Sequence, residues 1–233
     1  MIGASTRLVA LLGHPVAHSL SPRMQNAAFA VRGLDWAYVA LDVAPERLEE
    51  AVRGLAACGF AGANVTAPHK LAVAELVEAD APSVNTLLLR DGRVEGRSTD
   101  TAVLEQVTDC YKPVILGDGG AAAAFRHALP EARVFARKSD WPPDVRDADL
   151  VVNATPVRDE VLVELTAGQT LVDLPYPRSA TAVAAAAMGA RVFDGLEVLL
   201  AQGAASFELW TGVPAPLAAM RRALGVTPLR LRA

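Results

Sequence analysis

Residues 62–70 gather several side chains that could do chemistry at the end of an apolar segment. Asn64 and Thr66 stand two apart, so on an extended backbone both side chains point to the same face. Pro68 has a fixed φ and no N–H, so we expect a helix to begin there and to carry Lys70 in its first turn. The stretch therefore predicts a strand end that brings two hydrogen-bonding side chains and an amine into one space. Open α/β sheets bind their ligands at such strand ends.

Lysine is rare in this chain. Of 22 Lys and Arg residues, three are lysines, at Lys70, Lys112 and Lys138. Arginine stays protonated, whereas a lysine can lose its proton where the site favours the neutral amine. Lys70 is therefore a candidate for proton transfer. On spacing alone, the interpretation of Lys70 as an exposed surface residue of a helix is equally good.

A second polar loop, residues 13–22, follows the strand expected at residues 8–12. Ser19 and Ser21 stand two apart before Pro22, so we expect Ser21 to cap a helix whose first residue is Pro22. The free N–H groups of that helix end, together with the two hydroxyls, could hold an anion. If Ser21 is considered without Ser19, the alternative is that it caps the helix and binds no ligand.

A glycine-rich loop follows the strand expected at residues 112–117, and a helix and a strand at residues 133–136 come after it. Glycines let the backbone approach a pyrophosphate, and small residues let the helix pack closely on the sheet. This unit predicts a dinucleotide site whose backbone contacts come from Gly117, Gly119, Gly120 and Ala121.

The position that reads the adenosine ribose comes about 20 residues after such a loop. Arg137 and Lys138 stand there, after Ala136, with no acid to accept a hydrogen bond from the ribose of NAD. Two cations match a 2′-phosphate, so NADP(H) is the predicted cofactor. The alternative interpretation is that Arg137 and Lys138 are each an exposed cation after a strand with no role in binding.

Strands and helices alternate along most of the chain, which predicts an α/β protein. An Asp91-Gly92 turn indicates a hairpin over residues 83–97, and we expect residues 98–101 to cap a helix. Further strand ends are expected at residues 149–156, 170–177 and 191–195, with a helix at residues 181–188 between the last two. This alternation predicts a parallel sheet with helices on both faces.

Composition narrows the function classes. The net charge of −4 comes with no basic stripe, which argues against nucleic acid or an anionic membrane as a partner. Cys58 and Cys110 lack metal-ligand spacing, so we expect no metal site, and such a pair favours reduced thiols in the cytoplasm. No N-terminal signal and no run of ~18 apolar residues is visible.

Several motifs occur in the order seen in shikimate dehydrogenases, and over residues 8–212 the chain resembles a short member of that family. Two strings are specific, Ser19-Leu-Ser-Pro22 and Asn64-Val-Thr-Ala-Pro-His-Lys70. The others are Val84-Asn85-Thr86, Thr99-Asp100, the Gly117–Gly120 loop, Asn153-Ala-Thr-Pro156, Asp173 with Tyr176, and Gln202 with Phe207, Trp210, Thr211 and Gly212.

The resemblance implies an NADP-dependent oxidoreductase that interconverts shikimate and 3-dehydroshikimate, in aromatic amino acid and chorismate biosynthesis. It also implies two domains. Residues 1–100 would form an α/β substrate-binding domain, with C-terminal helices at residues 197–233 packing back on it. Residues 101–196 would form a Rossmann-type domain with a doubly wound parallel sheet. A homodimer is a candidate assembly.

The resemblance also implies roles for particular residues. Lys70 and Asp100 match the catalytic pair, in which the amine takes the alcohol proton and the carboxylate orients that amine. The substrate, a ring carboxylate with three hydroxyls, would be bound by Ser19, Ser21, Asn64, Thr66, Asn85, Tyr176 and Gln202. The cofactor would also be contacted by Thr155, Leu174 and Gly195.

The chain departs from the family mainly in its second half. It is short before Val84 and between Lys138 and Asp149, and Thr101 and Arg158 replace glycines. Asp118 lies within the glycine loop, where a carboxylate aimed at a pyrophosphate would repel it. These departures motivate two alternatives. One is a binding or regulatory module that keeps the shikimate pocket with little turnover, and the other is a quinate/shikimate dehydrogenase that uses NAD.

Overall fold

The computed structural model describes residues 2–108 and 110–226, and these form two compact units. The first unit holds the described residues up to Thr99 and those from Gly203 onward, and the second spans Asp100–Gln202. Residues 227–233, part of the segment expected to pack on the substrate domain, lie outside the described residues. None of the helices in the described ranges has the length and apolar character that crossing a membrane requires.

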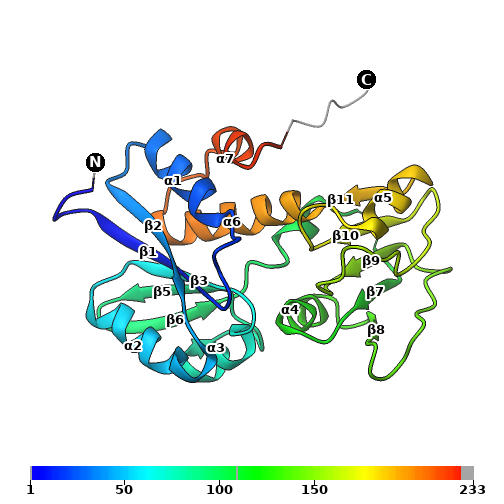
Figure 1. Ribbon diagram of the computed structural model, residues 1–233, viewed down its shortest axis with the longest axis horizontal. Helices are drawn as coiled ribbons and strands as arrows, with labels where there is room; N and C mark the ends of the chain where they lie inside the picture. The colour runs from blue at the N-terminus through cyan, green and yellow to red at the C-terminus, as the bar shows by residue number, and fades with distance from the viewer. Residues whose placement is uncertain (1, 109, 227–233) are drawn as a thin grey trace. The chain divides into compact units, whose positions relative to one another are not determined.

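The first unit contains a six-stranded mixed sheet in the order β2-β1-β3-β5-β6-β4 (Figure 1). Strand β1 runs parallel to β2 and β3, whereas β5 runs antiparallel to β3 and β6. Strand β4 is a short parallel partner of β6 that was not expected. The strands are β1 (Arg7–Gly13), β2 (Trp36–Asp42), β3 (Gly62–Val65), β4 (Glu78–Ala79), β5 (Thr86–Arg90) and β6 (Arg93–Arg97).

Helices cover both faces of this sheet (Figure 1). Helices α2 and α3 pack through Val52, Leu55 and Val73 against strand residues such as Ala63 and Leu87. On the other face, the Phe29 ring of α1 and the Phe207 ring of α6 stack with centroids 5.5 Å apart. The elements are α1 (Ser21–Val31), the 3₁₀ turn η1 (Pro45–Arg47), α2 (Leu48–Ala57), α3 (Lys70–Leu76), α6 (Gly195–Thr211) and α7 (Leu217–Leu224).

The hairpin prediction is confirmed. Asp91 and Gly92 join β5 to β6 with φ values of 50° and 75°. Two successive positive φ values define the turn type that matches the twist of an antiparallel pair. Asp91 tolerates this conformation better than most non-glycine residues do, and Gly92 adopts it freely.

Two predicted helix starts are wrong, and a third is correct in position but not in helix type. The helix expected from Pro68 begins at Lys70, because the His69 N–H donates to Thr66 O at 2.9 Å and closes a separate turn first. Ser21 is the first helical residue of α1 and not its cap, because Leu20 precedes it in the N-cap position. Residues 98–101 lead into a 3₁₀ helix, η2 (Ala102–Gln106), and its cap residue Thr101 makes no side-chain capping bond.

The second unit is built on five parallel strands in the order β11-β10-β9-β7-β8, as the strand–helix alternation predicted. Strand β7 leads through α4 to β8 on one side, and β10 leads through α5 to β11 on the other. The elements are β7 (Pro113–Leu116), α4 (Gly120–Ala128), β8 (Arg133–Phe135), β9 (Leu150–Asn153), β10 (Thr170–Asp173), α5 (Ala180–Ala187) and β11 (Arg191–Phe193).

Two hydrophobic clusters sandwich this sheet. Ala122 and Phe125 of α4 pack with Ile115, whereas Ala182 of α5 packs with Val114. Neighbouring residues of β7 therefore face opposite helix layers, as in a doubly wound sheet. The strand order reverses between β7 and β9, and such sheets bind ligands at that point, beyond the carboxyl ends of the strands.

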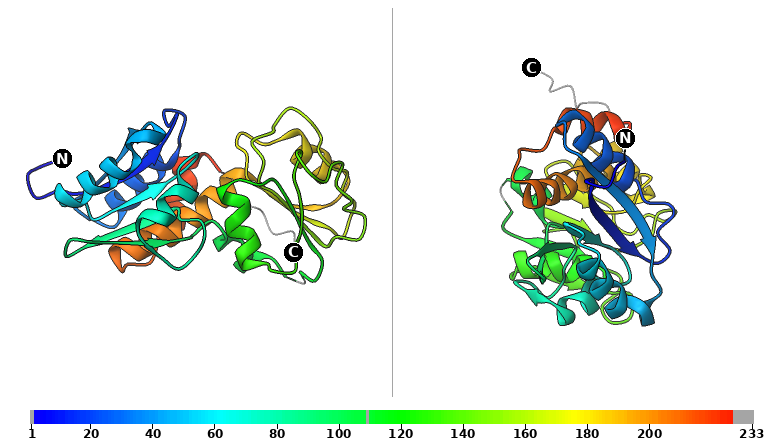
Figure 2. Two further views of the ribbon diagram at one scale, coloured as in Figure 1. Left: turned by 90° about the horizontal axis from the view of Figure 1, so that it is seen from below. Right: turned by 90° about the vertical axis from the view of Figure 1, so that its left-hand side faces the viewer.

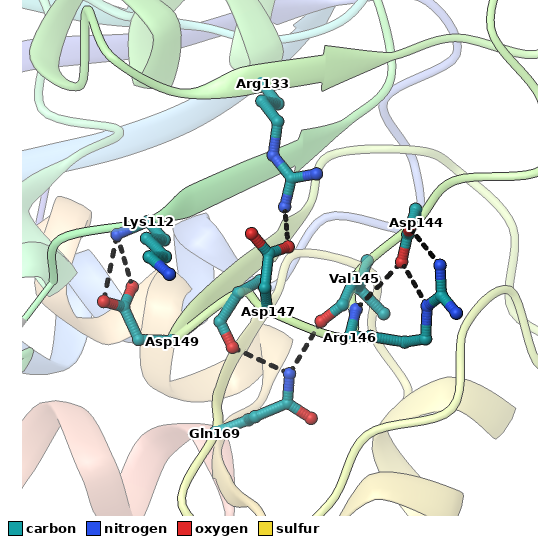
Figure 3. Close-up of polar contacts among 9 residues, drawn as sticks. Lys112, Arg133, Asp144, Val145, Arg146, Asp147, Asp149 and Gln169 are labelled. Atoms are coloured by element: carbon teal, nitrogen blue, oxygen red, sulfur yellow. Dashed lines mark hydrogen bonds and ion pairs between the residues drawn. The ribbon is translucent and has the colours of Figure 1, made fainter.

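Strands β8 and β9 are joined by residues 136–149, all described and without a helix (Figure 3). The Gln169 side chain donates to the carbonyl oxygens of Val145 and Ala148 at 2.8 Å each. Arg133 pairs with Asp147, and the Asp149 carboxylate accepts the Lys112 N–H. Side-chain bonds to the backbone thus hold the loop against the sheet (Figure 3). Figure 2 shows the ribbon of the protein in two further views.

Candidate active site

The backbone around Lys70 is anchored within the first unit. Lys70 is half-buried and opens α3, and its carbonyl oxygen accepts the Val84 N–H at 3.0 Å. The preceding His69 is 1% exposed, and its Nε2 lies 2.7 Å from the carbonyl oxygen of Val43. Because a carbonyl only accepts, this Nε2 carries the proton. The residue before Lys70 is thus tied to the segment that follows β2.

Asn64 lies opposite Thr86 in the β3–β5 pair, and its carboxamide has a defined orientation. Its Oδ1 accepts a bond from the Tyr38 hydroxyl at 2.8 Å, and its Nδ2 donates to the Asn85 carbonyl oxygen at 3.0 Å. Because a backbone carbonyl can only accept, the nitrogen must face Asn85 and the oxygen must face Tyr38.

Three buried hydroxyls lie beside that carboxamide. Thr86 and Ser206 are 2.8 Å apart, Thr99 and Ser206 are 3.1 Å apart, and Thr86 and Thr99 are 3.3 Å apart. Asn64 Nδ2 also contacts Thr86 Oγ1 at 3.1 Å and Ser206 Oγ at 3.0 Å. Strands β3 and β5, the segment after β6 and helix α6 therefore share one polar network.

The carboxamide oxygen of Asn85 is a shared acceptor in this network. Oδ1 accepts the Thr99 N–H at 2.7 Å, the Thr99 hydroxyl at 3.1 Å and the Thr86 hydroxyl at 3.0 Å. Asn85 is 2% exposed, so these bonds form away from water, where they are strongest. Asn85 thereby fixes the residue that directly precedes Asp100.

The other predicted substrate residues divide between the units. Ser19 Oγ accepts the Ser21 N–H at 3.2 Å in the loop before α1, and the Thr66 N–H donates to Leu12 O at 2.8 Å just after β3. The first unit thus contains Ser19, Ser21, Asn64, Thr66, Lys70 and Asn85, of which Asn64 and Asn85 are in direct contact. Asp100, which is 3% exposed, belongs to the second unit together with Tyr176 and Gln202, so the Lys70–Asp100 pairing stays a prediction.

The glycine loop lies at the carboxyl edge of the parallel sheet. Gly117 donates its N–H to Phe135 O at 2.8 Å and has a φ of 117°. A Cβ built on Gly117 would lie 3.2 Å from the Ala154 carbonyl carbon. Glycine is therefore required here, both for the backbone conformation and for the approach of the loop that follows β9.

The remaining predicted cofactor residues follow the other strands. The Leu174 N–H donates to Asn153 O at 3.0 Å, and a Cβ on Gly195 would lie 2.2 Å from Pro175 O. Parallel strands end at one edge, so the second unit brings the whole predicted cofactor set to that edge. The set is Gly117, Gly119, Gly120, Ala121, Arg137, Lys138, Thr155, Leu174 and Gly195.

Sequence reasoning did not assign a role to the buried Asn153–Asp173 pair. Asn153 Nδ2 donates to Asp173 Oδ1 at 2.8 Å, and Asn153 Oδ1 accepts the Thr155 N–H and hydroxyl at 3.1 and 2.7 Å. Both side chains of the pair are 0% exposed, and burial raises the pKa of Asp173 against the lowering effect of Asn153. The pair holds the turn that carries Thr155.

Tyr38, Thr86, Thr99 and Ser206 were likewise given no role from the sequence. Ser206 stands four residues after Gln202 on the same helix, and this spacing on one helix face could have suggested a polar function. Tyr38 alternates with apolar neighbours in β2 and gave no such indication. In the described part of the chain, no group of three or more His, Cys, Asp or Glu side chains is arranged to hold a metal ion.

The two units and their motifs define an α/β protein with a nucleotide-type parallel sheet. Residues 11–87 match the family model described as the shikimate dehydrogenase substrate binding domain. Residues 195–224 match the model described as the shikimate 5′-dehydrogenase C-terminal domain.

Relatives of known name agree with both matches. "Shikimate dehydrogenase (NADP(+))" of Anaeromyxobacter dehalogenans (strain 2CP-C) is 41% identical over 272 residues, which cover 96% of this chain and 98% of the relative. The chain therefore belongs to the shikimate dehydrogenase family. The aligned length exceeds the chain's own 233 residues, so segments of this relative have no counterpart here.

Solved structures give the same result. A crystal structure of a shikimate dehydrogenase in complex with NADP+ is 32% identical, with a TM-score of 0.87, and covers 97% of this chain and 98% of its own. The Thermus thermophilus enzyme in complex with NADP(H) and shikimate is 31% identical, with a TM-score of 0.83, over 94% and 99% of the two chains.

Proposed function

We propose that this protein is an NADP-dependent oxidoreductase that interconverts shikimate and 3-dehydroshikimate, the third-position alcohol and ketone of one ring carboxylate. The observation that carries the proposal is the polar network around Asn64 and Asn85 in a chain of this family. A site that hydrogen-bonds hydroxyls discriminates strongly against analogues that lack them. Such a network suits a polyhydroxylated ring far better than an apolar ligand.

In the proposed reaction, Lys70 is the proton-transferring group. During oxidation its neutral amine accepts the hydroxyl proton, and during reduction its ammonium returns that proton to the oxygen. Asp100 would orient the amine and stabilise its charged form. Ser19 and Ser21 would bind the ring carboxylate, while Asn64, Thr66, Asn85, Tyr176 and Gln202 would contact the rest of the substrate.

The second unit fits NADP(H) at the carboxyl edge of its sheet. Gly117 and Gly195 lie so close to neighbouring backbone that a Cβ would collide with it, which lets the loops at this edge pack closely together. Gly117, Gly119, Gly120 and Ala121 would contact the pyrophosphate, Arg137 and Lys138 the 2′-phosphate, and Thr155, Leu174 and Gly195 the remainder. NADP+, when bound, supplies the hydride acceptor.

Purified protein mixed with shikimate and NADP+ should form NADPH, and Lys70→Ala should lower the rate about 10²–10⁴-fold. Lys112→Ala is the matched control, because Lys112 is exposed on the second unit and has no proposed role. Shikimate binding without turnover under either cofactor would instead favour a binding or regulatory module. A faster rate with NAD+, or with quinate, would favour the quinate/shikimate alternative.

We also infer a cytoplasmic location and small molecules as the partners. The support is the pair of free cysteines, Cys58 and Cys110, in a chain of net charge −4. A homodimer stays a prediction, and sedimentation of the purified protein across a concentration series tests it.

A further inference from the structure

Arg137, the residue proposed to bind the 2′-phosphate, lies beside the glycine loop. It is the second residue after β8, whose last residue Phe135 pairs with Leu116 at the end of β7. The Gly117 N–H donates to Phe135 O, so the backbone before Arg137 is joined directly to the loop. This is the position from which a dinucleotide site reads the adenosine ribose.

Two side chains hold the Arg137 guanidinium. Its Nη2 forms an ion pair with the Glu160 carboxylate, and its central carbon lies 5.4 Å from the centroid of the Trp141 ring. The Arg137 and Glu160 side chains are 51% and 58% exposed, so a ligand from solvent can reach both. The cation that would meet a 2′-phosphate therefore already has an anionic partner.

The backbone of Glu160 is fixed by a buried contact. The Thr181 hydroxyl, at the start of α5, lies 3.3 Å from the Glu160 carbonyl oxygen and accepts the Leu162 N–H at 3.0 Å. Thr181 is 0% exposed. Glu160 is thus held beside the sheet by the core of the second unit, although its carboxylate reaches into solvent.

A carboxylate at this place has opposite effects on the two nicotinamide cofactors. It competes with a 2′-phosphate for the same guanidinium and repels that phosphate, which carries the same sign of charge. It can also accept a hydrogen bond from a ribose 2′-hydroxyl, which is the role of the acid in NAD-binding sites. Sequence spacing could not identify this acid, because Glu160 stands 23 positions after Arg137 and not next to it.

We propose that Glu160 is a specificity-determining residue for the cofactor. It neutralises Arg137 in the free enzyme, must be displaced by the 2′-phosphate of NADP(H), and supports the ribose hydroxyl of NAD(H). It thereby narrows the preference for NADP over NAD that Arg137 and Lys138 create. The inference rests on the proposed function, since it assumes that this edge of the sheet binds NADP(H).

Titration calorimetry on the full chain tests this inference with NADP+, NAD+ and 2′,5′-ADP as probes. Glu160→Gln should tighten NADP+ and 2′,5′-ADP about two- to fivefold, the range expected when one exposed ion pair is removed. NAD+ should bind no better, so the ratio of the two affinities rises. The matched control is Asp159→Asn, which removes an adjacent exposed charge and should leave that ratio within about twofold.

Arg137→Gln separates failure of this inference from failure of the proposed function. If Arg137→Gln weakens NADP+ but Glu160→Gln leaves the NADP+ to NAD+ affinity ratio unchanged, Glu160 has no role in specificity and the inference is overturned alone. If wild-type protein does not bind NADP+, or if Arg137→Gln leaves its affinity unchanged, the proposed cofactor site is overturned together with the inference.

Discussion

The hydroxyl of Tyr38 donates a 2.8 Å hydrogen bond to Oδ1 of Asn64, and this bond sets which end of the carboxamide faces strand β5. Tyr38→Phe removes the donor and keeps the ring. A neutral hydrogen bond contributes about 1 kcal/mol, so we expect KM for shikimate to rise about three- to tenfold, with KM for NADP+ unchanged. Tyr111→Phe, at a residue that is 79% exposed, is the control for steady-state kinetics. An unchanged KM for shikimate would show that this bond does not position the substrate wall.

Ser206→Ala should have a larger effect, because the Ser206 hydroxyl contacts Asn64, Thr86 and Thr99. Buried partners left without their bond cost about 1–3 kcal/mol. We expect kcat/KM for shikimate to fall about tenfold and the free energy of unfolding to drop by ~1–2 kcal/mol. Ser5→Ala removes an exposed hydroxyl and should change neither quantity. Loss of stability with unaltered kinetics would assign Ser206 a purely structural role.

Gly62→Ala should destabilise the first unit. A Cβ at Gly62 would lie 2.3 Å from Trp210 Nε1 and 2.8 Å from Leu87 O, which are joined by a 3.0 Å hydrogen bond. Overpacking of this kind costs ~1–3 kcal/mol, measurable by urea unfolding. Gly54→Ala in α2 is the opposite case, since a Cβ there would meet nothing within 4 Å. It should raise stability by roughly 0.5–1 kcal/mol, and equal effects of the two changes would contradict the packing argument.

Asp173 should give the stability a particular pH dependence. Burial raises the pKa of its carboxyl in the folded protein above the ordinary value of 3.8. The folded state then binds the proton more tightly than the unfolded state does. The contribution of Asp173 to stability is therefore fully present below the unfolded pKa and is lost as pH rises through the folded pKa. Each unit of raised pKa corresponds to about 1.4 kcal/mol.

Asp173→Asn keeps an acceptor for the Asn153 amide but cannot ionise, so its unfolding free energy should lack that fall. Thermal unfolding from acid to neutral pH measures the difference between the two proteins. Asp140→Asn, at an exposed position, should leave the wild-type curve unchanged. Identical curves for wild type and Asp173→Asn would mean that the carboxyl does not retain its proton on folding.

Asp118 is exposed in the glycine loop, and its removal should tighten NADP+ binding. The Asp118 carboxylate and the pyrophosphate carry the same sign of charge and repel each other, although salt screens part of this repulsion. We therefore expect Asp118→Ala to lower the Kd for NADP+ about threefold. Glu131→Ala removes an exposed charge outside the loop and controls for net charge. No change in Kd would mean that the Asp118 carboxylate points away from the phosphates.

The parallel sheet, the hairpin and the glycine loop could be predicted because each depends on short-range pattern. The Asp91-Gly92 turn, for example, is set by two residues whose backbone preferences are local. Helix starts were less predictable, since the turn from Thr66 to His69 competes with a helix start at Pro68. A single hydrogen bond decides whether such a segment forms a separate turn or the first turn of the helix.

The side-chain networks could not be predicted from spacing. Ser206 meets Asn64 across 142 positions of chain, and this contact depends on the rotation of α6 and the register of β3 together. The Arg137–Glu160 pair likewise joins two loops that follow different strands. Motifs could identify Asn64 and Arg137 themselves, but not the residues that hold them.

Strand β8 forms one edge of the five-stranded sheet, and this has a consequence for self-association. An edge strand offers its outer backbone to strands of other molecules and can start aggregation. Here the edge is three residues long, opens with the Arg133–Asp147 ion pair and is followed by a loop pinned by Gln169. A short, charged edge of this kind resists the addition of a strand from another molecule at β8.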